Sequence, residues 1–478
     1  MSVRAFVVAA VAPLIATGAL RSADSCLKLG KAGTQVQGLV RVCPGHYRIA
    51  DPKERGVLIV VSSGSRIDLS GVTLESGDTL PSDFVGTGVV LHGVDSVTVK
   101  GGRIRGYRFG VRVEGGQGHH ITSMDLSGSR QQALRSTTDR YDEGDWLDIF
   151  HPDTFETYGA GLYLLRAEGV VVTGVVARGA QNGIGLFETR MSTIADNDVS
   201  DNSGWGIHLW RASRNVITRN KADHNLRCES PSYSRGCDSA ALLLRQRSDS
   251  NLISDNDLSW SGDGFFLSGH RPLMEPSIAN VVVRNNASFA FHNAFESTFS
   301  EWNVFVENRA DSAEYGFWLG YSRSNSVERN SIIGSRMAGI AIEHGGDNGI
   351  AGNVIIGGRY GIRLFAPHEG DEASEGYRVD DNTIAMVEQG IVLERTVRTR
   401  LRGNLFDGVD DALIVDAAGA DASVSGNVFL RVRRWFVRAD SLDAGGNFWA
   451  TRSLDSTATM VQGRVNLRPW RPASAAGY

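Results

Sequence analysis

The stretch GWGIHLWRASRNVITRNKADHN, residues 204–225, decides the fold of this chain. Its order is Gly-apolar-x-apolar, then apolar-x-x-Asn, and it returns as GIGLFETRMSTIADN at 183–197 and GFWLGYSRSNSVERN at 316–330. The apolar residues alternate over short stretches, which is typical of β-strands and not of helices. Gly, Asn, Asp and Ser, which favour turns, lie between the stretches. The chain therefore repeats a unit made of short strands.

An asparagine ends each repeat and gives its length. Successive asparagines are 23, 36, 29, 23, 22, 23, 29, 22 and 23 residues apart. A base period near 22 residues with occasional insertions is typical of a solenoid, whose coils stack at about 4.8 Å. A leucine-rich repeat has a similar period, but here the asparagine follows a separate β-branched stretch. We expect an all-β solenoid with its asparagines stacked at one turn: Asn197, Asn220, Asn256, Asn285, Asn308, Asn330, Asn353, Asn382, Asn404 and Asn427.

This repeat resembles that of the right-handed parallel β-helix superfamily, over about residues 33–450. The segment VQGLVRVCPGHYRI at 36–49 looks like a first coil, and GVVLHGVDSVTVKGGRIRG at 88–106 continues it. The superfamily includes pectate and alginate lyases, polygalacturonases, mannuronan C5-epimerases and NosD-like periplasmic proteins. The resemblance implies a single right-handed parallel β-helix with loop insertions. It does not carry over an active site, because the DPHD motif of alginate epimerases is replaced here by FHPD at 150–153.

Composition and the N-terminal residues indicate an exported protein. Residues 1–24 carry an early Arg and then an apolar run, which predicts an export signal and a secreted or periplasmic location, with an uncleaved anchor as the alternative. The β-helix is expected over 25–450 and a C-terminal cap or tail over 451–478. The formal net charge of -5 argues against nucleic acid as a partner. No later segment is apolar enough to span a membrane, and the sequence leaves the oligomeric state open.

The cysteines and the acidic turns bear on disulfides and metals. Four cysteines in an exported chain predict two disulfides, for which Cys26–Cys43 and Cys228–Cys237 are the local pairs. The 11 His and 7 Met form no cluster with ligand spacing, so no metal site is predicted. Calcium stays open, because DNDVSDN at 196–202 and DEGDWLD at 142–148 supply oxygen ligands without matching a defined loop.

Four irregular segments interrupt the regular coils. They are residues 137–161, 224–239, 268–280 and 366–377. On a solenoid such insertions commonly form the wall of a binding face.

The strand positions predict which side chains share that face. In a strand written G-I-a-L-b-c, alternation directs positions a and b outward, and c lies at the strand exit. Column a is predicted as Tyr163, Gly185, His208, Leu242, Phe266, Phe295, Trp318, Ala341 and Arg363. Column b is predicted as Leu165, Phe187, Trp210, Leu244, Ser268, Ser297, Gly320 and Glu343. Column c is predicted as Arg166, Glu188, Arg211, Arg245, Gly269, Thr298, Tyr321 and His344. His270 lies just beyond column c, Asp263 lies just before its strand, and Glu296 falls at an interior position.

One outward face thus carries aromatic rings beside Arg, His and Glu side chains. Flat rings suit sugar faces and an elongated groove suits a chain-like ligand, so we expect a polysaccharide or oligosaccharide partner. The alternative is that an insertion covers the rings as a second core. The predicted substrate-binding residues are Tyr163, Glu188, Trp210, Trp318, Tyr321 and His344. The predicted catalytic residues are His208, Arg211, Arg245, Asp263, His270 and Glu296.

These groups are compatible with three functions. In a uronate lyase or C5-epimerase, Arg211 and Arg245 would neutralise the sugar carboxylate, a histidine (His208 or His270) would be the base, and Tyr321 or the other histidine the acid. In a glycoside hydrolase, Asp263 and Glu296 would flank the scissile bond, with Glu188 and Glu343 as further carboxylates. The third function is a non-catalytic NosD-like accessory or glycan-binding protein. The sequence favours a polysaccharide-active enzyme and leaves the sugar, the linkage and the reaction open.

Overall fold

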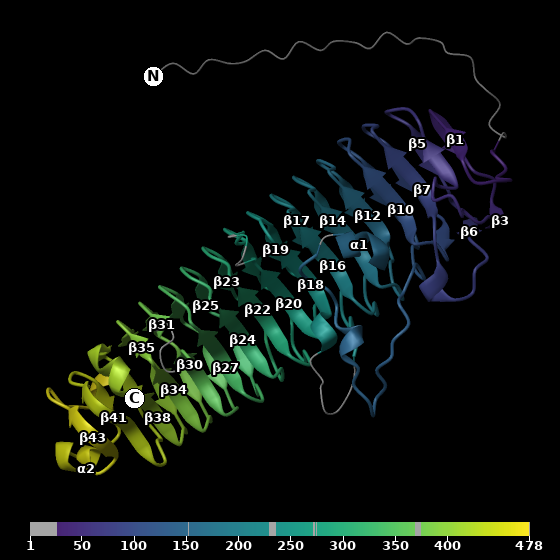
Figure 1. Ribbon diagram of the computed structural model, residues 1–478. Coiled ribbons are helices and arrows are strands. Elements are labelled where there is room, and N and C mark those ends of the chain that lie inside the picture. The colour runs from purple at the N-terminus through teal and green to yellow at the C-terminus, as the bar shows by residue number, and fades with distance from the viewer. Residues whose placement is uncertain are drawn as a thin grey trace, which may run out of the picture.

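The computed structural model describes residues 26–151, 153–228, 236–270, 273, 275–368 and 374–477. The chain winds into one elongated solenoid whose coils follow one another from β1 to β43 (Figure 1). Helical turns among these residues are short: α1 (Asp153–Tyr158), α2 (Leu454–Ala458), η1 (Pro81–Asp83), η2 (Glu143–Asp145), η3 (Gly236–Asp238), η5 (Ala417–Asp421) and η6 (Ala473–Ala476). None of the helices in the described ranges is long and apolar enough to cross a membrane. The all-β solenoid is confirmed, while the predicted export signal lies outside the described residues.

The largest face of the solenoid is a parallel sheet of 17 strands, which we call the large sheet. In pairing order its strands are β1 (Thr34–Val36), β4 (Leu58–Val60), β7 (Thr87–His92), β10 (Phe109–Glu114), β12 (Ala160–Leu165), β14 (Asn182–Phe187), β16 (Trp205–Trp210), β18 (Ala240–Arg245), β20 (Asp263–Ser268), β22 (Asn293–Thr298), β24 (Tyr315–Gly320), β27 (Ala338–Glu343), β30 (Tyr360–Phe365), β34 (Gln389–Glu394), β38 (Asp411–Val415), β41 (Trp435–Asp443) and β43 (Val461–Asn466). Since β43 pairs with β41, this sheet continues past residue 450.

A second parallel sheet of 15 strands forms another face of the solenoid. Its strands are β2 (Leu39–Arg41), β5 (Arg66–Asp68), β8 (Thr98–Lys100), β11 (His120–Thr122), β13 (Val171–Thr173), β15 (Thr193–Ala195), β17 (Val216–Thr218), β19 (Leu252–Ser254), β21 (Val281–Val283), β23 (Val304–Val306), β25 (Ser326–Glu328), β28 (Gly349–Ala351), β32 (Arg378–Asp380), β36 (Arg400–Arg402) and β39 (Ser423–Ser425).

Shorter strands complete the coils. Near the C-terminal end they are β26 (Ser331–Ile333), β29 (Val354–Ile356), β33 (Thr383–Ala385), β37 (Leu405–Asp407), β40 (Val428–Phe429), β42 (Phe448–Trp449) and β44 (Arg471–Pro472). At the N-terminal end they are β3 (Gly45–Arg48), β6 (Val72–Glu75) and β9 (Arg103–Arg105), and β31 (Ser374–Glu375) pairs with β35 (Thr396–Val397).

The repeated apolar residues fill the interior of the coils. In β16, Ile207 pairs with Ile184 of the coil before it and Leu242 of the coil after it, and all three are fully buried. One coil alone has no partner for this apolar face, so stacking is what removes it from water.

The repeated asparagines stack at one turn as predicted. Asn197 donates from its Nδ2 to Asn220 Oδ1 at 2.9 Å, and the Asn197 backbone N–H donates to the same oxygen at 3.1 Å. The pattern continues through the predicted residues to Asn447, which the sequence reasoning did not include. A second ladder, also not predicted, stacks Asn215, Asn251, Asn280, Asn303, Asn325 and Asn348. These ladders satisfy backbone groups that the turns would otherwise leave buried without partners.

The predicted columns are wrong by one residue in two strands. His208 pairs with Leu243 and not with Leu242, and Glu296 pairs with Trp318 in place of Phe295. A slip of one residue exchanges the two faces of a strand. Glu296 therefore belongs to outward column a and is not interior.

The same slip moves the residues that follow. Arg245 lies in column b beside Trp210 and Ser268, and Thr298 takes the column b place predicted for Ser297. The interior places are occupied by Leu244 and Ser297, both fully buried.

Both predicted disulfides are present. Cys26 bonds to Cys43 and Cys228 to Cys237, with Cα–Cα distances of 4.8 and 5.5 Å. The second bridge lies in an insertion directly before β18 and joins Cys237 of η3 to Cys228.

Candidate functional site

The irregular segment 129–159, which we call the lid, covers part of the outward face of the large sheet. Its helix α1 places Phe155 against three side chains of the sheet, with ring centroids 5.5 Å from Phe187, 6.0 Å from Trp205 and 4.6 Å from His208. Tyr163 is buried in the same cluster. The aromatic stripe on β12, β14 and β16 is therefore a second hydrophobic core beneath the lid. The prediction of an exposed stripe is wrong for these strands.

His208 is sealed in this second core. It is fully buried, and neither ring nitrogen has a hydrogen-bond partner among the described residues. Burial, together with the nearby Arg245 charge, holds the pKa of His208 well below its usual value, so the imidazole is neutral. In this arrangement no solvent reaches the ring that was predicted as a general base.

The two predicted arginines do not converge on one point. Arg211 donates from Nη2 to both oxygens of Glu275, at 2.8 and 2.9 Å, and its Cζ lies 4.7 Å from the Trp210 ring. Arg245 is fully buried under the lid, and Nε, Nη1 and Nη2 all lack a hydrogen-bond partner within the described ranges. Burial lowers the pKa of Arg245 to about 9, although the Asp148 and Asp238 carboxylates oppose the shift.

The other predicted catalytic pair does come together, on β20 and β22. Asp263, His292 and Glu296 place one ligand atom each within 4.8 Å of one another. The Asp263 Oδ1 lies 3.2 Å from His292 Nδ1 and accepts a hydrogen bond from the Asn293 backbone N–H at 2.9 Å. The Asn293 Nδ2 donates to Glu296 Oε2 at 2.5 Å and lies 3.1 Å from His292 Nδ1. We call these four residues the acid cluster.

Access to the acid cluster is from the side of His292. The His292 side chain is 22% exposed, whereas the Asp263 side chain is 2% exposed and Asn293 is fully buried. A ligand would thus approach past the imidazole and Glu296, which is partly buried.

The acid cluster holds its groups in different protonation states. Burial, with the Asp263 charge second, raises the pKa of Glu296 to about 8. Burial opposes the charged form of His292, but the Asp263 carboxylate outweighs it and raises the pKa of His292 to about 9. At neutral pH, Glu296 is therefore a protonated acid beside an Asp263–His292 ion pair.

A third acid faces this group from η3. Burial, with the Asp263 carboxylate second, raises the pKa of Asp238 to about 7. His292 and Arg245 act on it in the opposite direction, so Asp238 lies between the acid cluster and the buried guanidinium. The sequence reasoning missed both His292 and Asp238 because each lies just outside the strand template, although the neighbouring Cys237 marked the position of η3.

Aromatic side chains continue the face beyond the acid cluster. Trp318 follows Glu296 in column a, and the Tyr315 and Trp318 rings lie 4.9 Å apart. Farther along, the predicted Tyr321 and His344 stack face to face at 4.6 Å. These later coils lie beyond the part of the outward face where the second hydrophobic core packs under the lid.

The remaining predicted ligand-binding residues line one cavity on the earlier coils. Its volume is about 460 Å³. It is lined by Glu156, Tyr163, Leu165, Arg166, Phe187, Glu188 and Trp210. Glu188 lies 4.0 Å from Arg166 and does not pair with Arg211. The predicted residue His270 lies just after β20, between this cavity and the aromatic side chains of the later coils. Its ring centroid is 5.9 Å from that of Phe150 in the lid.

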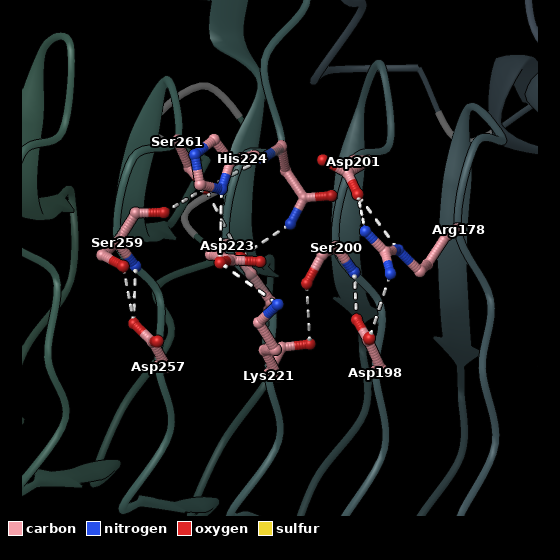
Figure 2. Close-up of polar contacts among 12 residues, drawn as sticks. Arg178, Asp198, Ser200, Asp201, Lys221, Asp223, His224, Asp257, Ser259 and Ser261 are labelled. Carbon is pink, nitrogen blue, oxygen red and sulfur yellow. Dashed lines mark hydrogen bonds and ion pairs between the residues drawn. The ribbon is translucent and has the colours of Figure 1, made fainter.

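The acidic turns considered for calcium are engaged elsewhere. Figure 2 shows Asp198 and Asp201 paired with Arg178 at the turns that follow the second sheet. In the other segment, Asp142 and Asp145 accept hydrogen bonds from backbone N–H groups of the lid. Within the described residues, the one group of His and acidic side chains close enough to hold a metal ion is Asp263, His292 and Glu296.

Two family models match parts of the chain. Residues 261–465 match a family described as periplasmic copper-binding protein (NosD), and residues 153–332 match the right handed beta helix region. No curated protein sequence matches the chain.

Several solved structures are similar to this chain at low identity. A double mutant of the periplasmic alginate epimerase AlgG is 12% identical, covering 76% of this chain and 84% of that chain, with a TM-score of 0.47. The mannuronan C-5 epimerase AlgE4 A-module of Azotobacter vinelandii is 14% identical over 70% and 91% of the two chains, with a TM-score of 0.38. PfbA, a surface adhesin of Streptococcus pneumoniae, is 11% identical over 84% of each chain, with a TM-score of 0.41.

Proposed function

We propose, for this member of the right-handed parallel β-helix superfamily, that it hydrolyses a glycosidic bond of a polysaccharide at the acid cluster. One observation carries the proposal: Asp263 and Glu296 meet on adjacent coils of the outward face, one ion-paired with His292 and the other with its pKa raised to about 8. Two carboxyl groups kept in different states by their surroundings supply both an acid and a nucleophile.

The spacing of the two carboxyl groups favours a reaction with retention of configuration. Their ligand atoms lie within 4.8 Å of each other. Retaining glycosidases keep the carboxyl groups about 5–5.5 Å apart, and inverting enzymes need roughly 6.5–9.5 Å to admit a water molecule. The separation here leaves no room for that water.

The roles follow from the protonation states. Glu296 donates its proton to the glycosidic oxygen as the bond to the anomeric carbon breaks, and the Asp263 carboxylate bonds to that carbon. Glu296, now ionised, takes a proton from water, whose oxygen displaces Asp263 and restores both groups. Since His292 stays charged, it balances Asp263 between turnovers and does not act as the base.

The shape of the face supports a chain-like substrate. Trp318 and Tyr315 lie on the coil after Glu296, and the cavity beside Trp210 lies on the coils before Asp263. Parallel coils repeat at about 4.8 Å, so these features follow one line along the solenoid axis. Flat rings beside polar groups suit sugar faces and hydroxyls.

Elimination or epimerisation is less well supported by the side chains. The base predicted for those reactions, His208, is sealed beneath Phe155, and Arg211 is held by both oxygens of Glu275. Hydrolysis needs neither residue.

We further propose that the protein works outside the cytoplasm. Two disulfides, Cys26–Cys43 and Cys228–Cys237, suit an oxidising compartment. Residues 261–465 also match the NosD family, whose members are described as periplasmic.

Incubation of the purified protein with acidic and neutral polysaccharides tests the proposal. We expect new reducing ends whose first-formed anomer, read by NMR, matches the substrate linkage. Asp263→Asn and Glu296→Gln should both abolish this signal, while Trp302→Ala, an exposed aromatic side chain away from the large sheet, should not. Products that absorb in the ultraviolet as unsaturated uronates would assign a lyase instead. Loss of activity in EDTA, restored by a divalent cation, would assign the cluster to a metal ion.

A further inference from the structure

Arg245 of β18 is a buried positive charge without an acceptor. The residue is fully buried, and its three guanidinium nitrogens make no hydrogen bond within the described part of the chain. Its Cζ lies 5.5 Å from the ring centroid of Phe150 and 5.8 Å from that of Phe155. Aromatic faces attract a cation, but they do not satisfy five N–H donors. A buried charge left in this state is unfavourable unless something else completes it.

Another buried arginine under the same lid shows what a structural role looks like. Arg227 is 5% exposed, and its guanidinium donates to Asp145 O, Ser203 O and Gln132 Oε1. The lid therefore supplies acceptors where it uses an arginine as a tie. It supplies none to Arg245.

The acids that face Arg245 are occupied or partly neutral. Asp148 of the lid accepts hydrogen bonds from the backbone N–H groups of Phe150 and His151 and from the His151 ring. Asp238 of η3 has its pKa raised to about 7 by burial and by Asp263. Neither forms an ion pair with Arg245 in the residues that the structure describes.

A second group without partners lies on the neighbouring strand. His208 of β16 is fully buried with both ring nitrogens unsatisfied, and its neutral imidazole has one N–H to donate. Its partner in the pairing of β16 with β18 is Leu243, two residues before Arg245. Phe155 covers this ring, whereas the half-exposed Phe150 lies against Arg245. The planar guanidinium of Arg245, which suits carboxylate and sulfate groups, is therefore the donor that a ligand could reach.

We propose that Arg245 binds an anionic group of the ligand, a carboxylate or a sulfate, with Phe150 of the lid as the cover of this site. The inference rests on the proposed function and names the substrate class as an acidic polysaccharide. Because β18 pairs directly with β20 and Arg245 pairs with Ser268, the charged group would be held one coil before β20, at the opposite end of that strand from Asp263.

Phe150 is the part of the lid suited to open. It is 51% exposed although its ring lies against the guanidinium, whereas Phe155, the other ring on Arg245, is 1% exposed and fixed in the second core. Rotation of one half-exposed side chain would open Arg245 to the ligand while the core under α1 stays intact.

Calorimetric titration of the full chain with sodium glucuronate, sodium sulfate and uncharged glucose, at constant ionic strength in chloride, tests the site. We expect one of the two anions to bind and glucose not to bind at the same concentrations. The anion that binds distinguishes a carboxylate from a sulfate as the recognised group. Arg245→Met should weaken this binding at least tenfold, and Arg178→Met, a matched change at an exposed ion pair, should leave it unchanged.

A stability readout separates a receptor from a structural arginine. If Arg245 binds the ligand, Arg245→Met removes an unpaired buried charge at similar volume, so the thermal midpoint should stay equal or rise. Phe150→Ala should keep anion binding. Three results would overturn the proposal. The wild type could fail to bind either anion, or Arg245→Met could bind the anion as well as the wild type does. The third is a fall in the thermal midpoint of Arg245→Met. Binding is measured without turnover, so an inactive protein that binds the anion would contradict only the hydrolase.

Discussion

The asparagine turn and the outward face of the large sheet differ in how their polar side chains are hydrogen-bonded. At the turn, asparagine recurs on each coil from Asn197 to Asn447, and Asn285 and Asn308 each contact a backbone group and the next asparagine. On the face between β16 and β22, no polar residue recurs, and His208, Arg245 and Asn293 Oδ1 have no hydrogen-bond partner among the residues that the structure describes. Repeated and satisfied groups hold the solenoid together, whereas the single and unsatisfied groups are where we propose that a ligand binds.

The first prediction tests the functional half of this comparison and has the largest effect. Glu296→Gln removes the proton donor and should lower kcat by about 10²–10⁴-fold, the usual contribution of a general acid. The thermal midpoint should not fall, because an amide of the same shape replaces a carboxyl group whose charge is disfavoured by burial. Reducing-end assays and thermal melts measure both. A large loss of stability with normal activity would show that Glu296 stabilises the fold and does not take part in catalysis.

The second prediction tests the structural half. Asn308→Ala removes the acceptor of the Asn285 backbone N–H and both donors to Val282 O and Asn330 Oδ1. Each buried group left without a partner costs about 1–3 kcal/mol, so the free energy of unfolding should fall by about 3 kcal/mol. Denaturant titration measures it, with Asn286→Ala as the control.

Asn286 is a suitable control because it directly follows Asn285 in the sequence but does not belong to the asparagine ladder. It is partly buried, its Nδ2 lies 3.5 Å from Asp257 Oδ1, and its Oδ1 accepts one hydrogen bond from the Ser288 backbone N–H at 3.3 Å. We expect its substitution to lower the stability by no more than about 1 kcal/mol, the usual net contribution of one hydrogen bond. Equal losses in the two variants would show that the ladder adds nothing beyond an ordinary turn.

The difference between the two regions also explains how much the sequence predicts. The asparagine spacing fixes the coil, the interior residues and the ladder, because every coil must meet the same stacking geometry. The register fails in AALLLR at 240–245 and NAFEST at 293–298. In the first, the lid buries the outward residues too, so alternation no longer distinguishes Leu243 from Leu242. In the second, the outward Glu296 follows two apolar residues.

The candidate site is harder to predict because contacts distant in sequence build it. Asp263 and Glu296 were identified from the sequence, and their adjacency depends only on the coil length. His292 and Asp238 come from turns whose path no repeat specifies. Nothing in the pattern of 129–159 indicates that Phe155 packs on His208, so only the structure shows that this histidine is covered.

The third prediction uses pH to separate the two regions. Glu296 and His292 have folded pKa values of about 8 and 9, raised from 4.5 and 6.5. A raised pKa gives stability that is complete below the unfolded value and is lost as the pH rises through the folded value. The thermal midpoint of the wild type should therefore fall between about pH 5 and pH 9, and activity should be lost above about pH 8.

Variants from each region should change this pH curve differently. Glu296→Gln removes one titrating group, so the difference in midpoint between the wild type and this variant should change between about pH 4.5 and pH 8, while the contributions of His292 and Asp238 remain in both. Asn308→Ala has no titrating group and should displace the whole curve downward without changing its shape. Parallel curves for both variants would contradict the raised pKa of Glu296.

The smallest effect is expected for the exposed Arg178 ion pairs shown in Figure 2. Arg178 pairs with Asp201 and Asp198, and its side chain is 43% exposed. Exposed pairs of this kind contribute about 0–1 kcal/mol and are screened by salt. Arg178→Met should therefore change the denaturation midpoint only slightly, and less at 1 M than at 0.1 M salt. A loss as large as that of Asn308→Ala would mean that repetition alone stabilises the solenoid. A small loss assigns the stability to buried and satisfied groups.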